Sequence, residues 1–504
     1  RSRPSSSTVA RRAVRSPAGP ARATVPWAEP DSRFTALLEA VVIDRPNAAA
    51  VAAHYGSVSV ATFAVGVAFL GRAQIPFEPT LPLLLVLLEV PAIVIGILLA
   101  RGLHPGTPWG EVGREVLLGR SVLLLLGGLF ADEWNNGDSF IARQEIDQRV
   151  ITPQNNFLTD ANRSMHRARL SAEQSIQLLK QYSPTAPGWQ LGEMYFIQSY
   201  IEDQAAEHYC SGVVFSTVVD GVEAYGTPLT TSATFTRALA HADSGLALVT
   251  GSTVDDVRVR SALQVIKGRI LLGLNRPAEA ATAVTGVATS FQYLTYHALT
   301  TTSNQFWNFN NLAGRYSVST SEGGTGMNFA LANDPRVPVC AGNDVVCRTI
   351  GVTKASRDDL STPYYVQRLW PVRESSVAIV SGQEARLIEA EAQLRAGNTG
   401  GSLTTLNALR ATFTGMTPLV DAGAEASRVD QLFRERAFTL FGRGTRTGDL
   451  RRLIRQYART AATVFPTGAW HKGGNYGTDV TLPLPLAETN NPNAGAGVCI
   501  DRNP

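Results

Sequence analysis

The sequence predicts a mainly α-helical protein built from pairs of helices and interrupted by one long, irregular, loop-rich insertion. Apolar residues recur at helical spacing through residues 162–290 and again through 375–455. Asn275-Arg276-Pro277 separates two of these helices with a stop and restart signal. Between the two helical regions, residues 291–374 are rich in Asn, Gly, Ser and Thr. Loops of that length are uncommon unless they serve a function.

The helices fall into three groups along the chain. They are expected at 162–182 and 191–209, then at 233–249, 254–274 and 278–288, and finally at 375–396, 402–412 and 427–440. Paired helices that pack through small alanine faces are typical of tetratricopeptide-like units, although the strict repeat consensus is absent. Residues 456–504 are expected to form a closing segment.

The composition excludes some classes of partner. The 504 residues contain 45 Lys and Arg and 42 Asp and Glu, which leaves a formal net charge of +3. A balance so close to neutral gives no reason to expect a nucleic-acid partner. The chain is long enough for a large core.

The first part of the chain differs from the rest. Residues 1–30 have the Arg-, Ser-, Pro- and Ala-rich composition of a disordered basic leader. Residues 31–115 are hydrophobic, and the run 80–100, with Glu89 as its one charge, is long enough to cross a bilayer as a helix. This region is either a membrane segment or sequence foreign to the fold. The binding domain is expected at 116–504.

Several sequence blocks occur in an order that resembles one known family. A charged helix at 434–444 runs into Arg446-Thr447-Gly448-Asp449-Leu450-Arg451-Arg452, and the chain closes with Leu482-Pro483-Leu484-Pro485 and Asn490-Asn491-Pro492-Asn493. Upstream lie the acidic, alanine-rich segment 384–398 and the Asn-x-x-Arg helix at 406–410. Together with residues 128–134, these blocks resemble the RagB/SusD family over roughly residues 120–504. Its members are surface lipoproteins that capture nutrients for TonB-dependent outer-membrane transporters.

The resemblance implies a function. The chain would be a non-enzymatic binding protein at the cell-surface side of the outer membrane, associated with the membrane and without a cofactor. It would pass an oligosaccharide, or less often a peptide, to a SusC-like TonB-dependent transporter. Two departures stand out. Thr439 and Arg443 occupy positions where the family usually has Glu, and no cysteine precedes Cys210, so the family's lipid anchor is not assigned to any residue.

The insertion holds the residues expected to contact the ligand. Aromatic rings stack on the apolar faces of sugars, and Asn and Arg side chains hydrogen-bond their hydroxyl groups. The candidates are Trp307, Asn308, Phe309, Asn310, Arg315, Tyr316, Tyr364 and Arg368. The alternative is that the aromatic side chains anchor a long loop to the core. Residues 364–370 alternate as in a strand, which would turn Tyr364 and Arg368 to one face.

A second set of charged residues is expected to be structural. It consists of Asp132, Glu133, Glu435, Arg436, Asp449 and Arg452, and the last four are expected to form an ion-pair network between the final helices. The acidic residues near Trp134 also allow a glycoside hydrolase, because such enzymes use two carboxyl groups. Adjacent residues such as Asp132 and Glu133 seldom face one pocket.

The four cysteines do not have the spacing of a metal site, and we expect no bound metal. Cys340 and Cys347 bracket a turn-rich loop short enough to be closed by a disulfide, although free thiols remain an alternative. Motifs of zinc proteases, serine hydrolases and P-loop NTPases are absent. The remaining alternatives are a helical-repeat scaffold that binds another protein and a peptide-binding protein.

Overall fold

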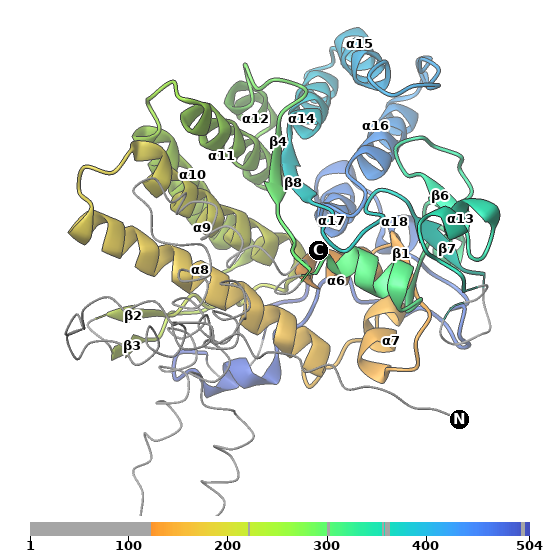
Figure 1. Cartoon of the computed structure of the whole chain (residues 1–504), viewed down its shortest axis with the longest axis horizontal. Helices are drawn as coiled ribbons and strands as arrows, with labels where there is room; N and C mark the ends of the chain where they lie inside the picture. The colour runs from red at the N-terminus through yellow and green to blue at the C-terminus, as the bar shows by residue number, and fades with distance from the viewer. Residues whose placement is uncertain (1–121, 220–221, 300–302, 355–356, 358–362, 495–498) are drawn as a thin grey trace, which may run out of the picture. The chain divides into compact units, whose positions relative to one another are not determined.

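The computed structural model describes residues 122–504 except 220–221, 300–302, 355–356, 358–362 and 495–498 (Figure 1). The basic leader at 1–30 and the apolar run at 80–100 therefore lie outside the described residues. Within the described residues, no helix combines the length and the apolar character needed to cross a membrane.

The prediction of a mainly helical fold is confirmed. The main helices are α6 (Val122–Phe130), α7 (Ile141–Gln148), α8 (Asn156–Tyr182), α9 (Gly188–His208), α10 (Thr231–Leu248), α11 (Val254–Gly273), α12 (Pro277–Ala283), α14 (Gly382–Arg395), α15 (Thr399–Arg410), α16 (Glu425–Thr439) and α17 (Arg446–Tyr457). Shorter helical segments are η1 (Trp307–Leu312), η2 (Glu322–Gly324), α13 (Val345–Thr349), α18 (Ala461–Val464) and η3 (Leu486–Asn490).

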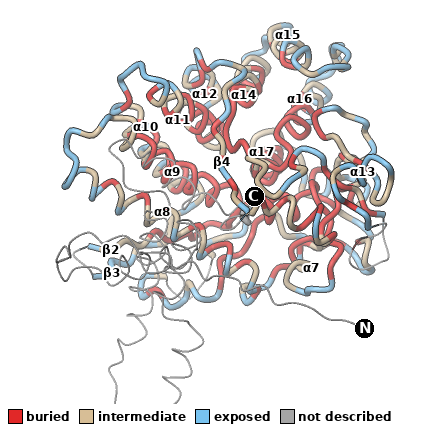
Figure 2. The backbone as a smooth tube through the Cα atoms, viewed as in Figure 1, coloured by how far each residue is buried: buried red, intermediate tan, exposed pale blue. Residues whose placement is uncertain are grey.

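Helix α9 lies at the centre of the first helical group. It is buried along most of its length (Figure 2) and contacts α8, α10, α11 and α17. Several of its buried residues are acidic, and two of them, Glu193 and Glu202, form close ion pairs. Glu202 accepts hydrogen bonds from Arg237 and His241, both at 2.7 Å, and Glu193 is 2.5 Å from a guanidinium nitrogen of Arg258. These pairs let a helix with carboxylates on it occupy the core, because a buried charge is tolerated when it is paired.

The apolar run that ends at Phe130 forms α6, an interior helix. Leu125, Leu126 and Phe130 are fully buried, and α6 contacts α7, α8 and α17. The hydroxyl of Thr447 in α17 donates to the carbonyl of Gly127 at 2.9 Å. Helix α6 therefore belongs to the core of the helical unit.

The helix expected at 375–396 is in part a strand. Residues Val377–Ser381 form β8, which pairs antiparallel with β4 (Gln292–Thr295), and α14 begins only at Gly382. Every residue of β8 is buried and most are β-branched, and such residues favour a strand. Ser381 then caps α14 by accepting from the Glu384 N–H at 3.3 Å.

Three further strand pairs are antiparallel. They are β1 (Trp134–Asn136) with β5 (Tyr316–Val318), β2 (Thr217–Val219) with β3 (Val222–Ala224), and β6 (Val339–Ala341) with β7 (Tyr365–Gln367). The pairs β1–β5 and β4–β8 join the insertion to segments on either side of it in the sequence. The insertion is therefore fastened to the helical body and does not form a separate layer.

The segment after α17 returns to the end of α9. The N–H of Leu482 donates to the carbonyl of His208 at 2.8 Å, and a disulfide joins Cys210 to Cys499 with 5.9 Å between their Cα atoms. The last described residues thus close over the end of the central helix.

Candidate ligand surface

The aromatic segment at 305–316 begins in a turn that the core holds firmly. The Phe306 ring is fully buried and stacks on Trp370, with 4.5 Å between the ring centroids. The side chain of Asn304 accepts a hydrogen bond from the Trp307 N–H at 3.1 Å. These contacts fix the start of η1, so the Trp307 side chain projects from an anchored backbone.

Four of the predicted ligand contacts are buried in the structure. Asn310 donates to the carbonyls of Tyr316 at 2.8 Å and Tyr365 at 3.1 Å, and its side-chain oxygen accepts from the Gln367 N–H at 2.9 Å. The Tyr364 hydroxyl donates to the Asn310 carbonyl. The four are Phe309, Asn310, Tyr316 and Tyr364, each less than 9% exposed.

The four buried side chains connect η1 to β5 and β7. The Phe309 and Tyr316 rings stack with centroids 5.0 Å apart. Burial also raises the pKa of Tyr364 above its ordinary value. We therefore leave these residues out of the ligand surface proposed below, because their contacts are internal.

Trp307 and Asn308 remain at the surface, where both are half-buried. The guanidinium of Arg373 lies 5.4 Å from the centroid of the Trp307 ring and donates to the Leu299 carbonyl at 3.0 Å. Asn308 donates to the Gln305 side chain at 3.2 Å. We call Trp307, Asn308 and Arg373 the Trp307 surface. It combines an accessible aromatic ring with amide and guanidinium donors, which is the chemistry that a sugar ring requires.

Arg315 and Arg368 lie elsewhere on the insertion. The Arg315 guanidinium is 5.5 Å from the ring of Phe140, which also lies 4.9 Å from the guanidinium of Arg143. Arg368 is exposed just after β7. Within the described residues, no hydrogen bond or ring contact joins either arginine to the Trp307 surface. Phe140, which is 55% exposed, is a second surface aromatic side chain besides Trp307, and no sequence pattern singled it out.

Comparisons with known proteins relate the chain to one fold. No curated protein matches the sequence. A sequence profile described as the Na+-dependent bicarbonate transporter superfamily matches residues 26–144. The described part of that match, residues 122–144, contributes α6, β1 and the start of α7 to the helical unit.

The solved structures match most of the chain. A SusD/RagB family protein from Bacteroides thetaiotaomicron is 13% identical with a TM-score of 0.57, covering 77% of this chain and 95% of its own. Surface glycan-binding protein A from Bacteroides uniformis is 13% identical with a TM-score of 0.57, covering 77% and 98%. A SusD-like carbohydrate binding protein from Bacteroides fragilis is 13% identical with a TM-score of 0.54, covering 74% and 92%. The chain has the RagB/SusD fold.

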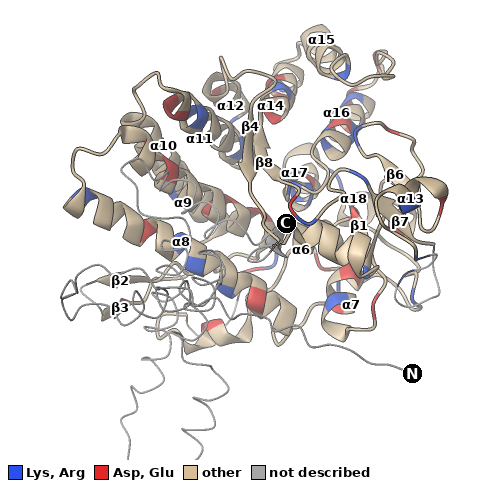
Figure 3. Cartoon of the chain, viewed as in Figure 1, with Lys and Arg blue, Asp and Glu red and all other residues tan. Residues whose placement is uncertain are grey.

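The recognition of this fold from the charged blocks is thereby confirmed. In the RagB/SusD fold of this chain, Arg436 and Asp449 form a bidentate pair with bonds of 2.8 and 2.9 Å, and Arg452 bonds both Asp449 and Glu391. The three helices α14, α16 and α17 supply these charges (Figure 3). Burial alone would raise the pKa of Glu391, but the guanidiniums of Arg452 and Arg436 hold it below its ordinary value.

Glu435 does not join that network. Its carboxylate points to the other side of α16 and binds Arg336 at 2.6 Å and Arg410 at 2.7 Å. The expectation placed all four charges in one cluster. The reason for the difference is the helical period, because adjacent residues of a helix face directions about 100° apart. Glu435 and Arg436 therefore serve different partners.

Asp132 and Glu133 are both buried in this RagB/SusD fold. Asp132 forms a bidentate pair with Arg446 at 2.6 and 2.8 Å, and Glu133 accepts from the Gly442 N–H at 2.9 Å. Both carboxyl groups are no more than 1% exposed. They do not flank an open cleft, which is what a pair of glycosidase carboxyl groups requires.

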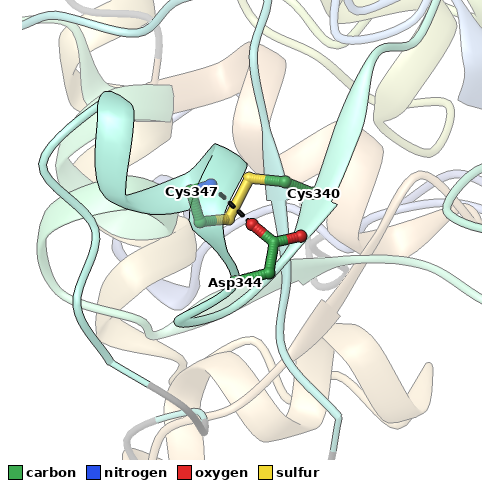
Figure 4. Close-up of side chains that lie close together, drawn as sticks. All are labelled: Cys340, Asp344 and Cys347. Carbon is green, nitrogen blue, oxygen red and sulfur yellow. Dashed lines mark hydrogen bonds between the residues drawn. A yellow bond between two sulfur atoms is a disulfide. The ribbon is translucent and has the colours of Figure 1, made fainter.

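The short loop between Cys340 and Cys347 is closed by a disulfide (Figure 4). Asp344 lies beside it and accepts from the Cys347 N–H at 2.6 Å, which caps α13. Cys340, Asp344 and Cys347 form the one cluster of possible metal ligands in the described part of the chain. Because both sulfurs are engaged in the disulfide, neither is available as a thiolate ligand.

Proposed function

We propose that this protein is a non-enzymatic binding protein at the cell-surface face of the outer membrane, which captures an oligosaccharide for a TonB-dependent transporter. The structural observation that supports this proposal most is Trp307, a half-buried indole held between the anchored η1 backbone and the Arg373 guanidinium. Surface glycan-binding protein A and the SusD-like carbohydrate binding protein, which share the fold, support the class of ligand. Binding without chemistry agrees with the burial of Asp132 and Glu133 in the core.

The proposed transporter partner is inferred from the shared fold. RagB/SusD-type proteins deliver ligand to a SusC-like barrel, so we expect a TonB-dependent transporter to be the partner of this chain. Affinity purification of the tagged full chain from its native membranes, followed by mass spectrometry, tests the partner. Recovery of a TonB-dependent barrel at comparable amount supports the proposal, and recovery of the chain alone argues against it.

A glycan array followed by calorimetry on the full chain tests ligand capture. We expect saturable binding to an oligosaccharide and a loss of about tenfold or more in affinity with Trp307→Ala, which corresponds to about 1.4 kcal/mol. Trp189→Ala is a matched control. Trp189 is also half-buried and also has a guanidinium near its ring, with Arg258 at 5.9 Å, but it lies in α9 outside the insertion.

Three outcomes separate the alternatives. Equal losses for the Trp307 and Trp189 variants reject the Trp307 surface as the site. Saturable glycan binding that neither variant changes supports the proposed function but shows that the binding site lies elsewhere. A folded protein that binds no glycan favours a peptide ligand or a protein-binding scaffold.

A further inference from the structure

A hollow of about 570 Å³, whose lining shares no residue with the Trp307 surface, lies between the loop before β6, the loop that joins α15 to α16, and α16 itself. This volume is within the range of ligand sites, roughly 300–1,000 Å³. Its lining includes Met327, Arg336, Arg410, Met416 and Arg434. We call it the Arg434 hollow.

The floor of the hollow is a closed set of charges. Glu435 bonds Arg336 at 2.6 Å and Arg410 at 2.7 Å, and Asp334 bonds Arg336 at 2.7 Å. Arg336 and Glu435 are buried, so their mutual bonds hold them in place. Two guanidiniums and two carboxylates balance, which makes the floor rigid and nearly neutral.

The wall formed by the α15–α16 loop is also fixed. The Arg410 Nε donates to the Thr417 carbonyl at 2.9 Å. The side chain of Asn407 makes two hydrogen bonds to the backbone of Leu419, at 2.7 and 3.1 Å, and Gln431 donates to the Val420 carbonyl at 2.9 Å. The hollow is therefore formed before a ligand arrives, which reduces the entropy that binding costs.

One cation of the lining has no acidic partner. Arg434 is exposed, its guanidinium lies 4.7 Å from the Phe438 ring centroid, and it donates to the Met327 sulfur at 3.8 Å. Among the described residues no carboxylate pairs with it. Asp430, the other acidic residue at the rim, is 2.7 Å from Arg459. Arg434 thus presents unneutralised positive charge beside a hollow whose other charges are balanced.

We propose that the Arg434 hollow binds the carboxylate of an acidic sugar unit, a uronate, within an oligosaccharide. The guanidinium of Arg434 matches a carboxylate in charge and in planar geometry. Met327 and Met416 supply an adaptable apolar surface for the ring C–H groups, and the amide of Gln431 and the backbone of the wall lie within the lining beside them. The proposal takes the saccharide class from the proposed function, but it concerns a different surface.

Calorimetry on the full chain with trigalacturonate, and with the neutral galactose trisaccharide of the same linkage, tests the proposal. We expect the acidic ligand to bind at least tenfold more tightly than the neutral one, and this preference to shrink when salt is raised from 0.1 to 1 M, because screening becomes much shorter in range. Arg434→Ala and Arg434→Gln are expected to remove the preference. Arg428→Ala is the control, because Arg428 lies on the same helix but is paired with Asp421 at 2.6 Å.

The outcomes separate this proposal from the proposed function. If the wild-type protein does not prefer the acidic ligand, or if the Arg434 variants keep that preference, the hollow is not a uronate site, whatever Trp307 does. If the preference depends on Arg434 but Trp307→Ala changes the affinity for no glycan, the uronate site is supported and the Trp307 surface is rejected as a ligand site. A peptide with a free C-terminal carboxylate is the third ligand. Tighter binding of that peptide, lost with Arg434→Ala, overturns the saccharide assignment.

Discussion

Arg446 in α17 forms a buried bidentate ion pair with Asp132, a residue 314 positions earlier in the sequence. Asp132 also accepts a hydrogen bond from the Met327 N–H at 2.8 Å. One carboxylate therefore joins the end of α6, the insertion and the last long helix.

The Asp132–Arg446 pair is expected to contribute strongly to stability. Asp132→Asn leaves the Arg446 charge without its partner in the core, and we expect a loss of about 3–5 kcal/mol in the free energy of unfolding. Urea denaturation followed by circular dichroism measures it. Adding Arg446→Met should restore part of the loss, because the second change removes the stranded charge. Arg428→Ala, which breaks an exposed pair, is expected to leave the urea midpoint nearly unchanged.

Stability is also expected to depend on the titration of Glu133. Burial raises the pKa of Glu133 to about 8, although the Gly442 N–H lowers it. The unfolded chain releases this proton near pH 4.5 whereas the folded chain keeps it to about pH 8. The free energy of unfolding therefore falls as pH rises through this window, by up to about 1.4 kcal/mol per pH unit for this one group.

Urea titrations from pH 5 to pH 8.5, on the wild type and on Glu133→Gln, measure this dependence. Other buried carboxyl groups titrate in the same range, so the difference between the two proteins is the informative quantity. We expect the glutamine variant to lose stability less steeply. Parallel curves would show that Glu133 is already ionised in the folded protein at pH 5.

The two disulfides are expected to differ in their effect on stability. The Cys210–Cys499 bridge spans 289 residues and the Cys340–Cys347 bridge spans 7. In the chain-entropy model, the longer loop gives about 3 kcal/mol more stabilisation. Paired serine substitutions at each bridge, compared by thermal unfolding under oxidising conditions, measure the difference. An equal or larger effect of the short bridge would contradict the chain-entropy account for this protein.

Tyr364 is expected to contribute to stability and not to ligand binding. Tyr364→Phe removes the hydroxyl that donates to the Asn310 carbonyl and should cost about 0.5–1.5 kcal/mol, because one hydrogen bond is lost while that carbonyl still accepts from the Gly314 N–H at 3.2 Å. Its affinity for any glycan should equal that of the wild type once folding is complete. Weaker glycan binding without loss of stability would return Tyr364 to the ligand surface.

The helices were the part of the fold that the sequence predicted best. Their 3.6-residue period and their end signals mark α10, α11 and α15 to within three residues at each end. The end signals include Asn275-Arg276-Pro277, which separates α11 from α12. Strand β8 was missed because Val377–Ser381 runs directly into α14 with no intervening turn.

The candidate site was harder to predict, because the sequence does not show which side of an aromatic loop faces solvent. Phe306 and Trp307 are adjacent, yet the first is in the core and the second is half-buried. Arg373 and Arg434 gave no signal among the many arginines. Arg373 matters because the fold brings it to the Trp307 ring, 66 positions earlier, and Arg434 matters because the fold brings no carboxylate of the described residues to pair with it.

The bonds that close the helical unit determine when it can form during synthesis. Helix α6 is the first of the described helices to leave the ribosome, but its partner α17 and the disulfide partner of Cys210 follow roughly 300 residues later. Helices α7 and α8, which also contact α6, are made soon after it, whereas the contact with α17 forms last. Until then the part of α6 that packs against α17 is uncovered, and transiently exposed apolar surface promotes aggregation. The native core is therefore completed only after nearly all of the chain has been made, and the Cys210–Cys499 bridge forms only in an environment that oxidises thiols.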